Sequence, residues 1–331
     1  MPLLPMISKA GSTGDPQPGL TGIPIIETLL RTGISILGCP LTLTQHIVSV
    51  WRNSSYLPKG QMVNIGGRQL HAHLSGEGRV TVILESGMGG CSLDWTFVQP
   101  ELSRHAAVLS YDRAGFGWSD PGREAPTCRQ AVKDLRVLLQ KLKLRPPYLL
   151  VGHSYGGMMM RLFASLYPDD VLGLVLVDAT HEQRLLPTGM SMTRRRQVNR
   201  HRQQLRMGYL CSPVMLPRLL KRPVGSRRLP DEAGCMSRWL GYQNKAYKQA
   251  YWEQLCAEAS ALQLQQAQPL PRELPVMVLT AGLQSEEWKE DQHALLELTD
   301  RTEQWLVEDS RHSIQIDRPQ TVMQAIKRLL Y

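Results

Sequence analysis

Short runs rich in Val and Leu, separated by helical stretches, constrain the fold of this chain more than any other feature. Five such runs are VTVILES (80–86), AAVLSYD (106–112), YLLVGHS (148–154), VLGLVLVDA (171–179) and VMVLTAG (276–282). Helical patterns separate several of them, for example QAVKDLRVLLQKLKL (130–144), in which apolar residues recur three and four positions apart. Strands that are apolar on both faces are typical of a parallel sheet covered by helices on both sides. The sequence therefore predicts an α/β fold with a mostly parallel, doubly wound sheet of about eight strands.

The first and last strands of the sheet follow from shorter signals. A β-hairpin is predicted for the segment MVNI, Gly66-Gly67, RQLHAHL. The paired glycines supply the positive φ that a tight hairpin turn requires. TEQWLVED (302–309) predicts the last strand, and a final helix is expected to begin at Pro319.

The alternation of strands and helices stops between residues 181 and 270, where helix-forming sequence continues without a strand signal. We predict a helical lid at 181–270, inserted after the sixth strand into a core made of residues 57–180 and 271–331. Residues 1–56 are expected to form an N-terminal segment that is disordered or amphipathic. The first twenty of them are rich in Pro and Gly, which predicts disorder.

The stretch VGHSYGG (151–157) places one serine between glycines at the end of an apolar strand. A Gly-x-Ser-x-Gly match alone is weak, but the strand before it and the helix-forming MMMRLFASLY after it are the setting of a nucleophile elbow. Gly152 and Gly156 fit a turn that leaves no room for side chains. Ser154 is therefore a candidate nucleophile at a helix N-terminus, where negative charge is favoured.

A serine hydroxyl needs a base, and the base needs an orienting acid. His312 follows the last predicted strand, so it is expected at the same sheet edge as Ser154. The acid has two candidates: Asp178, which ends the sixth strand, and Glu286, which follows the seventh strand. Both preserve the chain order Ser, acid, His. The sequence favours Asp178 and leaves Glu286 as the alternative.

Developing negative charge on a reacting carbonyl oxygen also needs fixed donors. We expect the backbone N–H of Tyr155, which follows the serine, to be one of them. The other is expected from the loop SGMGG (86–90), as the backbone N–H of Met88, because the glycines around it allow a substrate to approach closely.

With these residues, the chain resembles the α/β-hydrolase fold superfamily in its serine-hydrolase branch, over about residues 60–331. The resemblance rests on the segments ESGMGG, YDRAGFGWSD, VGHSYGG, LVLVDATH and SRHSIQIDRP, in that order. It implies that YDRAGFGWSD braces the oxyanion side of the site. Because the nucleophile position holds Ser154 and not Asp, it points away from the dehalogenase and epoxide-hydrolase branches. Ser86 and Arg311 depart from the His and Gly that many members have at these positions.

The resemblance implies a lidded esterase or lipase-like enzyme that forms an acyl-enzyme, with no cofactor and no metal. The substrate is expected to be a small apolar or amphiphilic ester. Hydrolysis of an amide, thioester or carbon–carbon bond on the same machinery remains an alternative, as does a non-catalytic binding module with the same fold. Substrate chain length and oligomeric state are left open. Six scattered cysteines predict reduced thiols. The expected location is cytoplasmic, with membrane association as the alternative.

The positive charge of the chain is concentrated in the predicted lid. Residues 184–248 hold fifteen Lys or Arg against two acidic residues, a net of +13, so the remainder of the +9 chain carries 9 − 13 = −4. This distribution suggests either a solvated helix or contact with an anionic membrane surface. No nucleic-acid recognition motif accompanies it, so no nucleic-acid partner is expected. Residues 32–51 carry no formal charge, but Pro40 and many polar residues favour an interfacial or core-packed segment over a transmembrane helix.

Overall fold

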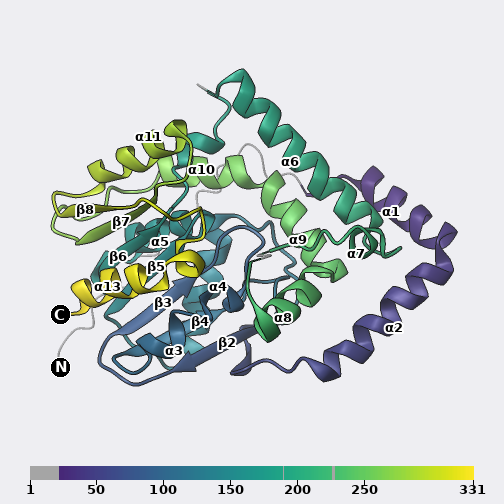
Figure 1. The fold of residues 1–331 in the computed structure, drawn as a ribbon, viewed down its shortest axis with the longest axis horizontal. Coiled ribbons are helices and arrows are strands. Elements are labelled where there is room, and N and C mark those ends of the chain that lie inside the picture. Colours follow the sequence, from purple (N-terminus) through teal and green to yellow (C-terminus); the bar gives the residue numbers. More distant parts are fainter. Residues whose placement is uncertain (1–21, 189, 226–227) are drawn as a thin grey trace, which may run out of the picture.

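The computed structural model describes residues 22–188, 190–225 and 228–331, so the first twenty residues, predicted to be disordered, lie outside the described part. One sheet of eight strands in the order β1-β2-β4-β3-β5-β6-β7-β8 crosses the molecule (Figure 1). This confirms the predicted α/β fold. The strands are β1 (Gln61–Asn64), β2 (Gln69–Ser75), β3 (Thr81–Glu85), β4 (Ala107–Tyr111), β5 (Tyr148–His153), β6 (Val171–Val177), β7 (Val276–Ala281) and β8 (Thr302–Val307).

Strand direction follows the predicted pattern. β1 and β2 form the expected antiparallel hairpin, and Gly66 and Gly67 in its turn have φ of 102° and 80°. β2 also runs antiparallel to β4, whereas all other neighbouring strands are parallel. β3, β4, β5 and β7 are buried along their whole length. The carboxyl ends of the parallel strands therefore meet at one edge, where functional residues of this fold class gather.

Helices cover both faces of the sheet because alternate strand residues point to opposite sides. Leu150 of β5 packs with helices α4 (Cys128–Lys141) and α5 (Tyr155–Leu166), whereas its neighbours Leu149 and Val151 pack with α3 (Gln99–Leu102) and α13 (Pro319–Leu330). The predicted final helix thus begins at Pro319. α11 (Glu286–Ala294), α12 (Ile314–Asp317) and the 3-10 helices at Ser92–Trp95, Pro168–Asp170, Glu182–Leu185 and Leu295–Leu298 complete the core.

A helical insertion separates β6 from β7, as predicted. It contains α6 (Met192–Cys211), α7 (Leu216–Leu219), α8 (Asp231–Gly241), α9 (Asn244–Leu255) and α10 (Ala257–Gln265), and we call it the lid. The basic sequence TRRRQVNRHRQQLR lies in α6, whose first turn is capped by the Ser191 hydroxyl accepting the Arg194 N–H. Figure 1 shows the lid over the sheet edge at which β5, β6 and β7 end.

Two helices precede the sheet, α1 (Ile25–Leu37) and α2 (Cys39–Ser55), with an angle of 94° between them. The uncharged segment 32–51 is therefore divided at Gly38, and Pro40 lies in the first turn of α2, where its missing N–H is not needed. Within the described residues, no single helix is both long and apolar enough to cross a membrane. The core-packed alternative for this segment is wrong, because the apolar side chains of these helices are largely exposed.

Candidate active site

Ser154 lies on a strained turn between β5 and α5. Its φ of 53° and ψ of −122° are rare for a residue with a side chain, and such strain collects at functional sites. The turn is possible only with glycine on either side. A Cβ on Gly152 would lie 2.6 Å from the Gly156 carbonyl oxygen, and a Cβ on Gly156 would lie 2.6 Å from the Ser86 carbonyl oxygen. These glycines therefore hold the serine hydroxyl out at the sheet edge.

The structure places the imidazole of His312 between Ser154 and Asp178, in hydrogen-bond contact with both. His312, in the loop between β8 and α12, has its Nε2 2.8 Å from Ser154 Oγ. Its Nδ1 lies 2.7 Å from Asp178 Oδ2. A serine, an imidazole and a carboxylate in this chain of hydrogen bonds can form an activated nucleophile, because the imidazole can accept the hydroxyl proton while the carboxylate orients the ring.

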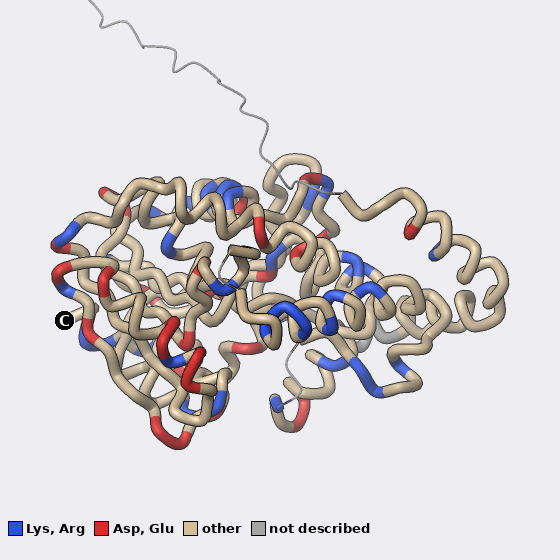
Figure 2. The backbone as a smooth tube through the Cα atoms, turned by 90° about the horizontal axis from the view of Figure 1, so that it is seen from above, with Lys and Arg blue, Asp and Glu red and all other residues tan. Residues whose placement is uncertain are grey.

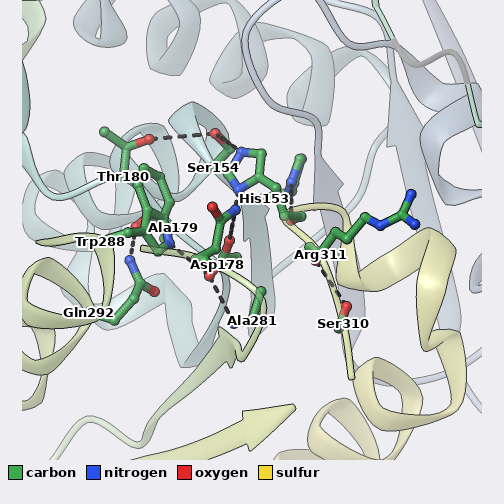
Figure 3. Close-up of polar contacts among 12 residues, drawn as sticks. His153, Ser154, Asp178, Ala179, Thr180, Ala281, Trp288, Gln292, Ser310 and Arg311 are labelled. Carbon is green, nitrogen blue, oxygen red and sulfur yellow. Dashed lines mark hydrogen bonds and ion pairs between the residues drawn. The ribbon is translucent and has the colours of Figure 1, made fainter. Parts of the chain in front are cut away.

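Asp178 is fully buried at the end of β6 (Figure 3). Its Oδ1 accepts from the Ala281 N–H at 3.0 Å and from Trp288 Nε1 at 2.9 Å. Gln284 Nε2 lies 3.3 Å from Oδ2. Glu286, the alternative acid, is not brought to His312, because its side chain is 83% exposed and pairs with Lys289 at 2.8 Å. The loop after β7 thus supplies donors that hold the acid of β6.

Two rings enclose the His312 imidazole. Trp288 meets it edge-on, with centroids 5.0 Å apart and an interplanar angle of 89°, and His153 lies on another side at 4.8 Å. His153 Nε2 lies 3.0 Å from the His312 carbonyl oxygen, to which it donates. Burial, followed by the neighbouring His312, lowers the pKa of His153 well below its usual value, so its ring is neutral. Sequence reasoning missed the roles of Trp288, Gln284 and His153; only their positions next to strand ends hinted at them.

The two predicted oxyanion donors lie beside Ser154. Tyr155 is the first residue of α5, and Met88 lines the same cavity as Ser154. The Gly87 carbonyl accepts from Arg113 Nη2 at 2.9 Å, and the Ser86 carbonyl accepts from Arg113 Nη1 at 2.7 Å. Because the carbonyl of Gly87 and the N–H of Met88 belong to one planar trans peptide and point in opposite directions, Arg113 fixes the direction of the Met88 donor.

Arg113 itself lies in a buried ionic network that the sequence did not predict. Its Nη1 is 2.5 Å from Glu85 of β3, and its Nε is 2.9 Å from Glu253 of lid helix α9. Burial tends to lower the pKa of Arg113, but the carboxylates of Glu253 and Glu85 overcome this and raise it well above its usual value. One lid residue therefore pairs with the arginine whose guanidinium holds the Ser86 and Gly87 carbonyls of the loop after β3.

The segment YDRAGFGWSD braces the same loop through a buried carboxylate. Asp112 accepts from the Ser92 N–H at 2.7 Å and from the Trp118 N–H at 3.0 Å, and its Oδ2 lies 2.8 Å from His71 Nδ1. These bonds to the charged form, together with His71, outweigh burial and keep the pKa of Asp112 low. The turn thus fixes the position of the loop that follows β3.

A cavity of about 830 Å³ extends from Ser154 and His312 to the lid. Gly87 to Gly90 line it, as do Met207 of α6, Leu216 of α7 and Leu220 directly after α7. A cavity of this volume can hold a drug-sized or single-chain acyl molecule. No three His, Cys, Asp or Glu side chains gather as metal ligands within residues 22–188, 190–225 and 228–331.

A family model described as the alpha/beta hydrolase fold matches residues 80–319, most of the chain. The chain belongs to the α/β-hydrolase fold family. Among curated proteins, this α/β-hydrolase is 35% identical over 131 residues to an uncharacterized Bacillus subtilis protein, YqjL, which covers 39% of the chain and 49% of the relative. It is also 35% identical over 123 residues to a Pseudomonas putida 2-hydroxy-6-oxo-2,4-heptadienoate hydrolase. This alignment covers 36% of the chain and 44% of the relative.

Solved structures share the fold of this α/β-hydrolase. The epoxide hydrolase CorEH superposes with a TM-score of 0.66 at 18% identity, over 82% of this chain and 97% of that one. A thermophilic esterase from Thermogutta terrifontis superposes with a TM-score of 0.60 at 20% identity, over 82% of this chain and 98% of that one. At these identities the likeness shows the fold alone. The chain spans less than half the length of the first curated relatives it matches, so their activities are not transferred from the alignments.

Proposed function

We propose that this protein is a serine hydrolase that cleaves a carboxylic ester, or a related acyl bond, of an apolar or amphiphilic substrate. The observation that carries the proposal is the position of His312, with one ring nitrogen 2.8 Å from Ser154 Oγ and the other 2.7 Å from Asp178. The strained backbone of Ser154 and the cavity beside it support the same function.

In the first half of the reaction, His312 Nε2 takes the proton of Ser154 as the hydroxyl oxygen attacks the substrate carbonyl carbon. Asp178 holds the Nδ1–H of the imidazole, which fixes the tautomer and stabilises the imidazolium that forms. The backbone N–H groups of Met88 and Tyr155 receive the carbonyl oxygen as it becomes negative. The tetrahedral intermediate then collapses, and the leaving alcohol takes the proton from His312.

In the second half, water attacks the acyl group on Ser154 while His312 again acts as the base. The acid product leaves as the serine regains its proton, so bonds and protons balance without a cofactor. Removal of one oxyanion donor typically reduces kcat by about 10²–10³-fold. The hydrogen bonds of Arg113 to the Ser86 and Gly87 carbonyls support this role, because they hold the donor loop before substrate arrives.

Hydrolysis of a carbon–carbon bond next to a ketone is a second candidate for the same residues. The similarity to the Pseudomonas putida hydrolase over about a third of the chain favours it. Amide and thioester bonds are also open to this chemistry, since the lid and cavity select the substrate. A non-catalytic binding protein is disfavoured by the intact hydrogen-bonded chain from Ser154 to Asp178.

Covalent labelling by a fluorophosphonate probe tests the proposal. We expect the wild-type chain and Ser165→Ala, a control serine on the same helix, to label and to hydrolyse p-nitrophenyl esters. Ser154→Ala should do neither while keeping the wild-type unfolding temperature. Equal labelling of Ser154→Ala and wild type would refute the mechanism. A panel of esters of increasing chain length, with a vinylogous ketone and an amide beside them, then separates the bond classes.

A further inference from the structure

The two helices before the sheet bury polar residues and expose apolar ones, the reverse of a soluble amphipathic helix. We call α1 and α2 the N-terminal arm. In α1 the buried side chain is Glu27, 7% exposed, and in α2 it is Gln45, 2% exposed. The large apolar side chains exposed on the arm are Ile25, Ile26, Leu29, Leu30, Ile36, Leu37, Leu41, Leu43, Ile47, Val50 and Trp51. Such an arrangement is stable when the medium outside the arm is apolar.

Polar side chains attach the arm to the lid. Glu27 accepts from Arg206 Nε at 2.8 Å and from the Tyr251 hydroxyl at 3.1 Å. Gln45 Nε2 donates to the Tyr242 carbonyl at 3.1 Å. Arg31 donates to the Tyr209 carbonyl oxygen and lies with its guanidinium 4.6 Å from the Tyr209 ring centre. The arm is therefore docked on the protein through its polar side, which leaves the apolar side facing outward.

The exposed apolar surface continues from the arm onto the lid. α7 and the residue after it expose Leu216, Leu219 and Leu220, at 39%, 64% and 61%. Gly38, at the bend of the arm, packs against Val214 just before α7. Leu216 and Leu220 also line the cavity that reaches Ser154. The apolar surface and the cavity therefore share these two exposed leucines.

The charge around this surface has one sign. No Asp or Glu occurs from residue 28 to 76 or from residue 183 to 230, whereas both stretches contain Arg and Lys. Lys221 and Arg222 are exposed directly after Leu220. In Figure 2 the arm, at the right of the view, is almost entirely tan, and blue turns of the lid lie between it and the sheet. A positive border around an apolar surface complements anionic phospholipid, whereas a second copy of this chain would bring the same charge and be repelled.

Neither helix of the arm is long enough to cross a bilayer alone, since α2, the longer one, has 17 residues, or about 26 Å of helix. α1 has 13 residues, which corresponds to about 20 Å of helix, and the hydrocarbon core of a bilayer is about 30 Å thick. Together α1 and α2 have the length and composition of a span, but the 94° angle between them makes them a bent pair and not one straight helix. Helices of this kind lie in the interface with the apolar side in the acyl region.

We propose that the N-terminal arm and α7 dock this protein on an anionic phospholipid bilayer and that the cavity takes an amphiphilic acyl lipid directly from that leaflet. The apolar side chains of the arm enter the acyl region, and Lys221 and Arg222 contact the headgroups. The cavity mouth at Leu216 and Leu220 then faces the leaflet, so an acyl chain reaches Ser154 without crossing water. The identity of the substrate rests on the proposed function; the docking does not.

Flotation with vesicles tests the docking, using the full chain with phosphatidylcholine alone and with phosphatidylcholine containing 30% phosphatidylglycerol. We expect wild type to float with the anionic vesicles, and tenfold less with neutral vesicles or in 0.5 M salt. The triple variant Ile36→Gln, Leu37→Gln, Leu41→Gln should lose at least tenfold of the binding. The control double variant Leu283→Gln, Leu306→Gln removes exposed leucines outside the apolar surface and should bind as wild type.

Two results would overturn the docking. One is equal flotation of wild type and the arm variant, with both keeping the wild-type unfolding temperature. The other is wild type that does not float but sediments as a dimer, and an arm variant that is monomeric, since the arm would then bind a second copy.

Hydrolysis rates on soluble and on vesicle-borne substrates distinguish a loss of membrane docking from a loss of catalysis. The arm variant should hydrolyse a soluble short-chain ester at the wild-type rate and a vesicle-borne acyl lipid at least tenfold more slowly. Ser154→Ala should float as wild type. If it floats but wild type shows no hydrolysis of any acyl substrate, the proposed function fails and the docking stands. If wild type hydrolyses the vesicle lipid at the same rate with and without the arm substitutions, direct uptake from the leaflet is wrong.

Discussion

A buried carboxyl beside the oxyanion loop makes a quantitative prediction about stability. Asp94 is 5% exposed and lines the cavity next to Gly89 and Gly90. Its Oδ1 has no hydrogen-bond partner within the described part of the chain. Burial, aided by the nearby charge of Asp112, raises the pKa of Asp94 from 3.8 to about 7. The folded protein therefore holds a proton on this carboxyl at a pH where the unfolded chain has lost it.

The sign of the effect follows from this raised pKa. Stability contributed by the bound proton is fully present below the unfolded pKa of about 3.9, and it is lost as the pH rises through the folded pKa near 7. The loss is about 1.4 kcal/mol per pH unit near pH 5 and about half of that at pH 7, where the carboxyl is half titrated, so it sums to about 3 kcal/mol between pH 5 and pH 8. Asp94→Asn keeps the shape of the side chain and cannot titrate, so it should remove this part of the pH dependence.

Urea unfolding at pH 5, 6, 7 and 8 measures the free energy of unfolding of wild type and of Asp94→Asn. Groups that titrate in the same way in both proteins cancel in the difference between the two values. We expect the free energy of unfolding of wild type, relative to the variant, to fall by about 3 kcal/mol between pH 5 and pH 8. Asp169→Asn, at an exposed carboxyl, is the matched control and should give a constant difference. A difference for Asp94→Asn that stays constant to within about 0.5 kcal/mol would refute the reasoning.

Two further substitutions test how the site is assembled. Asp178→Asn should reduce kcat about 10³–10⁴-fold because it reverses the tautomer of His312, whereas Glu286→Gln should leave kcat unchanged. Steady-state ester hydrolysis measures kcat for both variants. An equal loss of kcat in both would contradict the assignment of Asp178 as the acid. Glu253→Gln keeps an oxygen for Arg113 Nε but removes the charge beside the guanidinium, so kcat should fall at least tenfold with KM unchanged. A rise in KM alone would mean that Glu253 shapes the lid and does not act on the oxyanion loop.

The sheet and the pair Ser154 and His312 could be predicted because their signals are local or topological. Strands apolar on both faces specify a covered parallel sheet, and the glycines around Ser154 specify a turn without space for Cβ atoms. His312 follows from topology alone, since the carboxyl ends of parallel strands meet at one edge.

The acid could not be assigned from the sequence alone. β6 and β7 are adjacent and in register, with Val177 opposite Leu279, so a carboxylate after either strand reaches the same edge. The choice depends on how the chain turns after β7. There Ser285 caps α11 by accepting the Trp288 N–H, which turns Glu286 to solvent and the Trp288 indole toward Asp178. Local propensity predicts the cap, but not which side of the helix faces the site.

The Arg113 network could not be predicted either, because its partners are far apart in sequence. Glu253 lies 140 residues after Arg113, on a lid helix whose path depends on the packing of the other lid helices. Buried charges are rare and are tolerated only when paired, so a sequence pattern assigns such residues to the surface by default.

The exposure of the N-terminal arm could not be predicted from the sequence either. The sequence correctly marked residues 32–51 as uncharged and interrupted by Pro40, but hydropathy cannot tell whether leucines are covered by protein or exposed. That distinction comes from Glu27 and Gln45, which occupy the inward side of the arm through contacts with lid residues 173 to 224 positions later. Once these polar residues hold the inward side, the helical period directs the aliphatic residues outward. The exposed apolar surface therefore follows from where the lid offers hydrogen-bond partners to the arm.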